Sequence, residues 1–239
     1  MVSASGTLAV GAEKAWDMAV RQGAGRMFIV NQMDREHANF AKTLDTLREK
    51  YGSSVVPLIV PIGSAADFKG VVNLLENKAF EGAGKGIKEI PVPGSLSDDV
   101  VHYIEEITEA AAESDDALLE KYFDAGELSH EEILVGFRKG MQSGKIVPVV
   151  CVSALTGVGV VPLLDMMTTY LASPEGTQME GVNPKTGEEV IRTCGSGEPF
   201  SAFVFKTVAD PFVGKLSLFR VTSGTLTPAT SLYNATQEK

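Results

Sequence analysis

The sequence predicts an α/β protein built on a parallel sheet, with an inserted α+β segment and an incomplete all-β domain after it. Short apolar runs alternate with helix-forming stretches in residues 1–54 and 146–172, which is typical of strands buried on both faces of a parallel sheet. The stretch between them, 55–145, is strongly acidic. Beyond residue 198, apolar and polar residues alternate one by one, which indicates strands with one buried face.

The first α/β segment contains a helix, a strand and a second helix. Residues 12–22 place small and apolar side chains at helical spacing, and the glycines that follow end the helix. Residues 27–30, Met-Phe-Ile-Val, form the expected buried strand. Residues 36–51 again carry apolar side chains at helical spacing, and Gly52 ends this second helix.

The insertion opens with an apolar strand at 56–62 and continues through a glycine-rich, hairpin-like stretch at 81–86. A strongly acidic helical region begins at Asp98. The α/β pattern then returns, with a buried strand at 146–152 and a helix at 161–171. We therefore expect one α/β domain interrupted by a small subdomain.

The last part of the chain predicts a linker and then strands. Residues 173–198 are rich in Gly, Pro, Thr and Glu, as linkers are. Residues 199–207 and 215–221 alternate as strands do, and a turn follows at 223–225. About three strands cannot close a barrel, so we expect 199–239 to be the beginning of a β-barrel domain.

The composition predicts a soluble protein of the cytoplasm, and we expect a monomer. The chain has 239 residues and a net charge of −10, which argues against a broad nucleic-acid-binding surface. Its two cysteines form no disulfide framework and favour a reducing compartment. No apolar run is long enough to span a membrane, and the first residues do not resemble a signal peptide.

The clearest functional motif is Asn31-Gln32-Met33-Asp34, directly after a buried strand. Ligands bind at the carboxyl ends of strands in α/β sheets. A carboxylate such as Asp34 accepts two parallel hydrogen bonds from a ring N–H and an exocyclic amine, which guanine offers and adenine does not. Asn31 would connect neighbouring loops around the base. The alternative is a polar turn in which Asp34 caps the helix at 36–51.

A second polar loop, Ser153-Ala154-Leu155, follows the buried strand at 146–152. Small residues allow backbone N–H groups to approach a carbonyl oxygen such as the six-oxo group of guanine. Taken alone, Ser153 is better explained as the N-cap of the following helix. Two loops with matching chemistry at neighbouring strand ends favour a guanine site.

These residues resemble the translational GTPase family, and most closely elongation factor G and its paralogues. Asn31–Asp34 is similar to the family's guanine-specificity motif, usually Asn-Lys-X-Asp, and Ser153–Leu155 to its second guanine-contacting loop. The resemblance implies a P-loop-GTPase-like sheet, an inserted subdomain and the start of a β-barrel second domain. Further matching stretches lie in the last two of these parts, at 67–74, 118–122, 210–216 and 219–221.

The resemblance implies GTP or GDP as ligand, with Mg²⁺ in the whole protein. The residues that would contact the nucleotide are Asn31, Gln32, Asp34, Ser153, Ala154 and Leu155. Gln32 departs from the usual lysine and is shorter and neutral. Because selectivity rests more on Asp34, we expect weaker affinity with specificity retained.

The phosphate-binding machinery is missing from these 239 residues. A P-loop requires Gly-x-x-x-x-Gly-Lys-Ser/Thr, and the Gly-Lys pairs at 84–85, 144–145 and 214–215 lack both its first glycine and its hydroxyl residue. Asp67–Gly70 fits the Asp-x-x-Gly of a magnesium switch loop, but it follows the guanine motif instead of preceding it. We therefore expect no catalytic or metal-binding residue, no bound Mg²⁺ and no GTP hydrolysis by this chain alone.

The acidity is concentrated between Asp98 and Glu132, which contain thirteen Asp or Glu residues and one Lys. Glu105, Glu109 and Glu113 follow one another at i, i+4 on one helix face. One alternative is a solvated face. The other is a docking surface for a basic partner, and the resemblance implies the ribosomal stalk protein.

The sequence thus predicts a fragment of an elongation factor G-like GTPase, which would hydrolyse GTP while moving tRNA and messenger RNA through the ribosome. A non-catalytic module that keeps a GTPase-like scaffold for protein contacts remains an alternative. So does a ribosome-protection or release-type paralogue.

Overall fold

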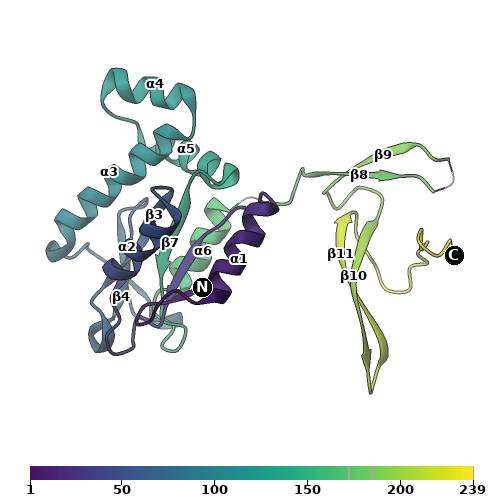
Figure 1. The fold of residues 1–239 in the computed structure, drawn as a ribbon, viewed down its shortest axis with the longest axis horizontal. Helices are drawn as coiled ribbons and strands as arrows, with labels where there is room; N and C mark the ends of the chain where they lie inside the picture. Colours follow the sequence, from purple (N-terminus) through teal and green to yellow (C-terminus); the bar gives the residue numbers. More distant parts are fainter. Residues whose placement is uncertain (172, 185, 239) are drawn as a thin grey trace. The chain divides into compact units, whose positions relative to one another are not determined.

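The computed structural model describes residues 1–171, 173–184 and 186–238. The chain divides into two compact units, Met1–Ala172 and Ser173–Lys239, and each is described by itself. The predicted α/β fold class is confirmed for the first unit, and small β-hairpin sheets form the second (Figure 1).

The first unit contains one seven-stranded sheet in the order β1-β2-β7-β3-β4-β5-β6. Neighbouring strands are parallel from β1 to β3, and the remaining pairs are antiparallel. Residues 55–145 therefore extend the same sheet through β3–β6 instead of forming a separate one. The strands are β1 Val2–Ser3, β2 Phe28–Asn31, β3 Val55–Ile62, β4 Gly70–Asn73, β5 Lys78–Glu81, β6 Lys88–Ile90 and β7 Val147–Cys151.

Six α-helices occur among the described residues of this unit, and the predicted helices at 12–22 and 161–171 are confirmed with small shifts at their ends. Figure 1 shows α3, α4 and α5 gathered in one helical group. The helices are α1 Val10–Arg21, α2 Phe40–Tyr51, α3 Ser97–Glu113, α4 Asp116–Ala125, α5 His130–Ser143 and α6 Val160–Tyr170.

The spacing predicted that helix α2 begins at residue 36, but it begins at Phe40. The side chain of Asn39 accepts a hydrogen bond from the Lys42 N–H at 2.9 Å, so Asn39 is the N-cap and Asp34 is not. The alternative interpretation of Asp34 as a cap for this helix is therefore wrong.

The core of the first unit surrounds the two central strands β7 and β3. Every residue of β7 is buried, because neighbouring strands flank both of its edges and helices pack against the central strands of the sheet. Trp16 on α1 stacks on Phe28 of β2 and contacts Tyr51 of α2, which ties these two helices to the sheet. This packing anchors the beginning of β2, whose other end leads into the first predicted loop.

The second unit consists of two hairpins. Residues 173–198, expected as a linker, contain the pair β8 Gln178–Val182 and β9 Glu189–Thr193. The pair β10 Ser201–Asp210 and β11 Gly214–Ser223 confirms the two strands predicted after residue 198. Residues 224–238 contain no strand, so the described residues hold no third strand of the expected barrel.

Candidate functional site

Three parallel strands end at the same edge of the sheet and carry the predicted loops. In the register of the sheet, Ser3 of β1 lies opposite Asn31 of β2, and Val30 lies opposite Cys151 of β7. Asn31 is the last residue of β2, and Ser153 follows β7 by two residues. The fold thus places both predicted loops at neighbouring strand ends, where α/β proteins bind ligands.

Asn31 joins the two loops directly. Its side-chain Oδ1 accepts a hydrogen bond from the backbone N–H of Ala154 at 2.9 Å, across 123 positions of sequence. A backbone bond from the Met33 N–H to the Val152 carbonyl, 3.3 Å long, adds a second connection. The loops that sequence reasoning proposed separately therefore form one structural unit.

Two groups in these loops are available to a ligand. The half-buried Asp34 carboxylate has no hydrogen-bond or ion-pair partner within the described part of the chain. The Leu155 N–H likewise has no partner among those residues, and the Leu155 side chain is 87% exposed. An acceptor carboxylate and a backbone donor match the amine and oxo groups of guanine.

Ser153 has a local structural role in the second loop. It is fully buried, and its Oγ accepts a hydrogen bond from the Thr156 N–H at 3.1 Å. Its carbonyl accepts another from the Gly157 N–H at 2.8 Å. Helix α6 begins at Val160, so the alternative of Ser153 as its N-cap is wrong. Ser153 shapes the turn that presents Ala154 and Leu155.

Gln32 is held by a residue that the sequence analysis did not identify. The Ser3 hydroxyl donates a hydrogen bond of 2.7 Å to Oε1 of Gln32. Strand β1 has only two residues, which is too short for a periodic pattern to reveal. Only the pairing of β1 with β2 brings Ser3 to this edge.

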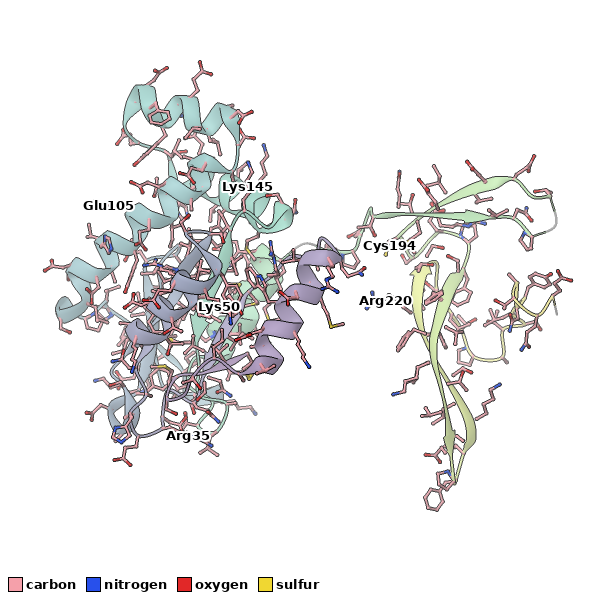
Figure 2. All side chains as sticks on the ribbon, in the orientation of Figure 1. Arg35, Lys50, Glu105, Lys145, Cys194 and Arg220 are labelled. Atoms are coloured by element: carbon pink, nitrogen blue, oxygen red, sulfur yellow. The ribbon has the colours of Figure 1, made fainter. Side chains whose placement is uncertain are left out.

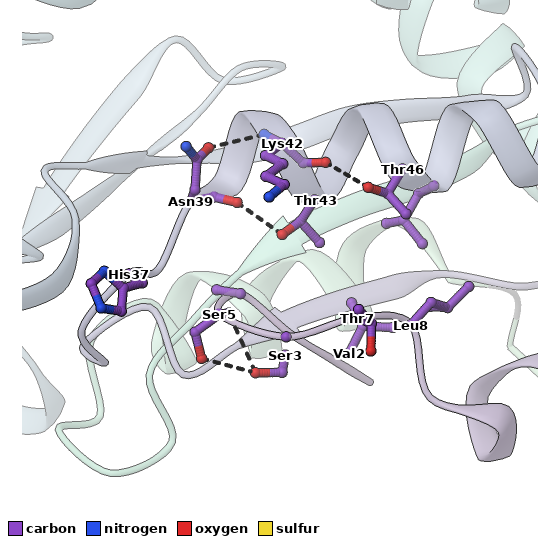
Figure 3. A pocket seen from close by; sticks show the side chains of 13 residues that line it. Val2, Ser3, Ser5, Thr7, Leu8, His37, Asn39, Lys42, Thr43 and Thr46 are labelled. Carbon is purple, nitrogen blue, oxygen red and sulfur yellow. Dashed lines mark hydrogen bonds between the residues drawn. The ribbon is translucent and has the colours of Figure 1, made fainter.

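A cavity of about 320 Å³ has Ser3 among its lining residues (Figure 3). The segment after β1 and the first turns of α2 line it, with polar side chains that include Ser5, Thr7, Asn39 and Lys42. Its lining includes neither Asp34 nor Ser153–Leu155, so this cavity is distinct from the predicted guanine site.

The three glutamates predicted to form a docking surface are exposed on α3. Glu105, labelled in Figure 2, Glu109 and Glu113 have no salt-bridge partner among the residues described. Glu106, between them in sequence, differs because it pairs with Arg48 at 2.5 Å. The apolar face of the helix is buried through Val100, Ile107, Ala111 and Ala112.

Several motifs occupy structural positions. Residues 82–87 connect β5 to β6, and Asp67–Gly70 leads from a 3₁₀ turn into β4. Burial raises the pKa of the Cys151 thiol well above its usual range, as expected of a core cysteine. No three His, Cys, Asp or Glu side chains in the described ranges could hold a metal ion. No helix there is long and apolar enough to cross a membrane.

The sheet, with two polar loops joined at its carboxyl edge, defines a nucleotide-binding α/β domain. Residues 1–173 match the family described as the elongation factor Tu GTP binding domain. The chain therefore belongs to this family of translational GTPases, which confirms the sequence resemblance at the level of the family.

A crystal structure of a protein from Thermus thermophilus is similar to this chain, with a TM-score of 0.79 and 30% sequence identity. The match covers 97% of this chain and 32% of the Thermus protein. The chain thus spans about a third of the length of that protein. The matched region of this chain includes its second unit. The predicted fold class, an α/β domain followed by β-strands, agrees with the fold of this neighbour.

Proposed function

We propose that this chain is the guanine-selecting part of an elongation factor G-like translocation GTPase that acts on the ribosome in the cytoplasm. The observation that carries the proposal is the hydrogen bond from the Ala154 N–H to Asn31 Oδ1. This hydrogen bond holds the two loops side by side at the carboxyl ends of β2 and β7, where we propose that a purine base binds. The stretches at 67–74 and 118–122 favour elongation factor G within the family.

Each loop contributes one part of guanine recognition in this proposal. The Asp34 carboxylate accepts hydrogen bonds from the ring N–H and the exocyclic amine of the base. The Leu155 N–H, next to Ala154, donates to the six-oxo oxygen. Adenine presents the opposite pattern of donors and acceptors, so the same groups reject it.

The chain's own residues do not fit the phosphates or Mg²⁺. No Gly-x-x-x-x-Gly-Lys-Ser/Thr occurs in the 239 residues, and no cluster of three or more His, Cys, Asp or Glu side chains that could hold a metal ion lies in the described ranges. In translational GTPases that bind Mg²⁺, the ion neutralises phosphate charge during transfer. We propose that this chain selects the base without hydrolysing GTP.

Calorimetric titration of the chain with GDP and with ADP tests the proposal. We expect GDP to bind with a dissociation constant above about 1 μM, and ADP to bind more weakly still. Asp34→Asn should abolish the preference for GDP, because an amide no longer accepts both hydrogen bonds. Asp45→Asn, which removes an exposed carboxylate on α2, is the matched control. Equal binding of GDP and ADP by the unmodified chain would contradict the proposal, as would sub-micromolar GDP affinity.

We further propose that Glu105, Glu109 and Glu113 form the docking surface for the ribosomal stalk protein. These exposed carboxylates have no salt-bridge partner among the described residues, so a basic partner would not have to displace an existing ion pair. Reversal of all three to Lys should weaken stalk binding and reduce its salt dependence. Reversal of Glu120, Asp124 and Glu127, exposed residues on and after α4, makes the same charge change elsewhere. Equal effects of the two sets would show that only net charge matters.

A further inference from the structure

The turn that follows β2 has an unusual backbone at Gln32. Its φ is +68°, in the left-handed region that residues with a Cβ rarely adopt. Hydrogen bonds on both sides hold this conformation: the Ala4 N–H donates to the Asn31 carbonyl at 2.9 Å, and the Arg35 N–H to the Gln32 carbonyl at 3.1 Å. Such conformations persist where the surroundings fix them. The turn therefore presents the Gln32 side chain in one defined direction.

That side chain is oriented by Ser3. The Ser5 N–H donates to Ser3 Oγ at 3.4 Å, and the Ser5 hydroxyl, which can also donate to it, lies 3.4 Å from the same oxygen (Figure 3). The Ser3 hydroxyl proton is then free to bind Oε1 of Gln32, at 2.7 Å. The amide oxygen is thus occupied, whereas Nε2 and its two N–H groups have no partner within the described ranges.

We propose that Ser3 is a positioning residue that makes Gln32 act only as a hydrogen-bond donor toward an acceptor atom of the bound nucleotide. The inference rests on the proposed binding of a guanine nucleotide at this edge. An unrestrained glutamine amide could present either its oxygen or its nitrogen to a ligand, and the oxygen would repel an acceptor. With its oxygen bound to Ser3, Gln32 presents the nitrogen.

The proposal explains why a glutamine can occupy a position that the sequence resemblance assigns to lysine. A lysine ammonium carries donors and no acceptor, so its binding needs no orienting partner. Gln32 reaches the same donor-only state through Ser3, without the positive charge. The Ser3 hydroxyl should therefore matter when residue 32 is glutamine and not when it is lysine.

A double-mutant cycle on the full chain tests this dependence. GDP affinity is measured by NMR titration for the unmodified chain, Ser3→Ala, Gln32→Lys and the double variant. We expect Ser3→Ala to weaken GDP binding about 3- to 10-fold, the range of one hydrogen bond. In the Gln32→Lys background the same change should have less than about a twofold effect. Ser3→Thr, which keeps the hydroxyl, should bind GDP as the unmodified chain does.

Thr7→Ala is the matched control, since it removes an exposed hydroxyl from the same segment that has no hydrogen bond to Ser3 among the described residues. An equal loss of affinity in Ser3→Ala and Thr7→Ala would overturn the proposal, and so would an equal loss from Ser3→Ala in both backgrounds. Thermal unfolding midpoints of all variants show whether any loss reflects folding.

A measurement without ligand separates this proposal from the proposed function. The Gln32 side-chain amide resonances should shift in Ser3→Ala and remain in place in Thr7→Ala. If they do not shift in Ser3→Ala, the positioning role is wrong whatever the chain binds. If they shift but the unmodified chain does not prefer GDP to ADP, the guanine assignment alone fails.

Discussion

Both units of this chain contain strands with apolar residues, but these residues are buried in the first unit and exposed in the second. In residues 1–172, all five residues of β7 are buried between β2 and β3. In residues 173–239, β10 pairs only with β11, and its Phe203 and Phe205 are 67% and 61% exposed. Among the described residues, every buried apolar side chain lies in the first unit.

This difference shows that strand pairing does not by itself create a buried core. Alternating apolar residues suffice to build the hairpin of β10 and β11, because its hydrogen bonds need only one partner strand. A core needs a second layer that covers the apolar face, and among the described residues only the first unit has helices that do so. We therefore expect the free energy of unfolding to depend on apolar side chains in the first unit only.

The largest expected effect compares two phenylalanines. Phe137 on α5 is fully buried and packs edge-on against Tyr170, at 5.9 Å between ring centroids. Phe137→Ala should lower the free energy of unfolding by about 3–5 kcal/mol, because a large cavity remains. Phe205→Ala should change it by less than about 0.5 kcal/mol. Urea unfolding followed by the fluorescence of Trp16, the only tryptophan, measures both, and similar costs would contradict the comparison.

A second pair of variants tests close packing. A Cβ on Gly136 of α5 would collide with the Ala111 carbonyl of α3, so Gly136→Ala should cost about 1–3 kcal/mol of unfolding free energy. In the second unit, a Cβ on Gly181 of β8 would meet no atom closer than 3.9 Å. Gly181→Ala should leave the urea midpoint unchanged. A tolerated Gly136→Ala would mean that α3 and α5 can separate without loss.

Acid should weaken the first unit through Glu132. The Lys121 ammonium, together with the Ser129 N–H and hydroxyl, lowers the pKa of the Glu132 carboxyl from 4.5 to about 2. Since the folded-state pKa is depressed, this contribution is fully present above pH 4.5 and is lost as the pH falls through about 2. Glu132→Gln should therefore lower the thermal midpoint at about pH 6 more than at about pH 2. An equal change at both pH values would contradict the ion-pair explanation.

The smallest expected effect concerns the turn of the second unit. The Val213 and Phe212 N–H groups donate to the Asp210 carboxylate, at 2.9 and 2.8 Å, and lower its pKa. Stabilisation of the turn should be present above the ordinary pKa of 3.8 and lost at lower pH. NMR of the Val213 amide proton should report this loss. Asp210→Asn keeps an acceptor without the charge and should remove most of the pH dependence.

The fold was predictable where short stretches carry a regular pattern. The apolar run at 27–30 and the helix at 161–171 were located within one or two residues, because hydrophobic periodicity is local. The start of α2 was predicted four residues too early, because the N-cap of this helix is Asn39. The hairpin of β8 and β9 was missed because its polar composition resembles that of a linker.

The sequence by itself determined the chemistry of the candidate site: an amide, a carboxylate and a small polar loop, each directly after a buried strand. The tertiary structure decided which of these groups meet. The bond between Asn31 and Ala154 spans 123 positions, and that between Ser3 and Gln32 spans 29. Periodicity along the chain contains no information about which strands become neighbours or in what register. That choice depends on how the sheet buries its two faces, and it alone brought Ser3 to Gln32.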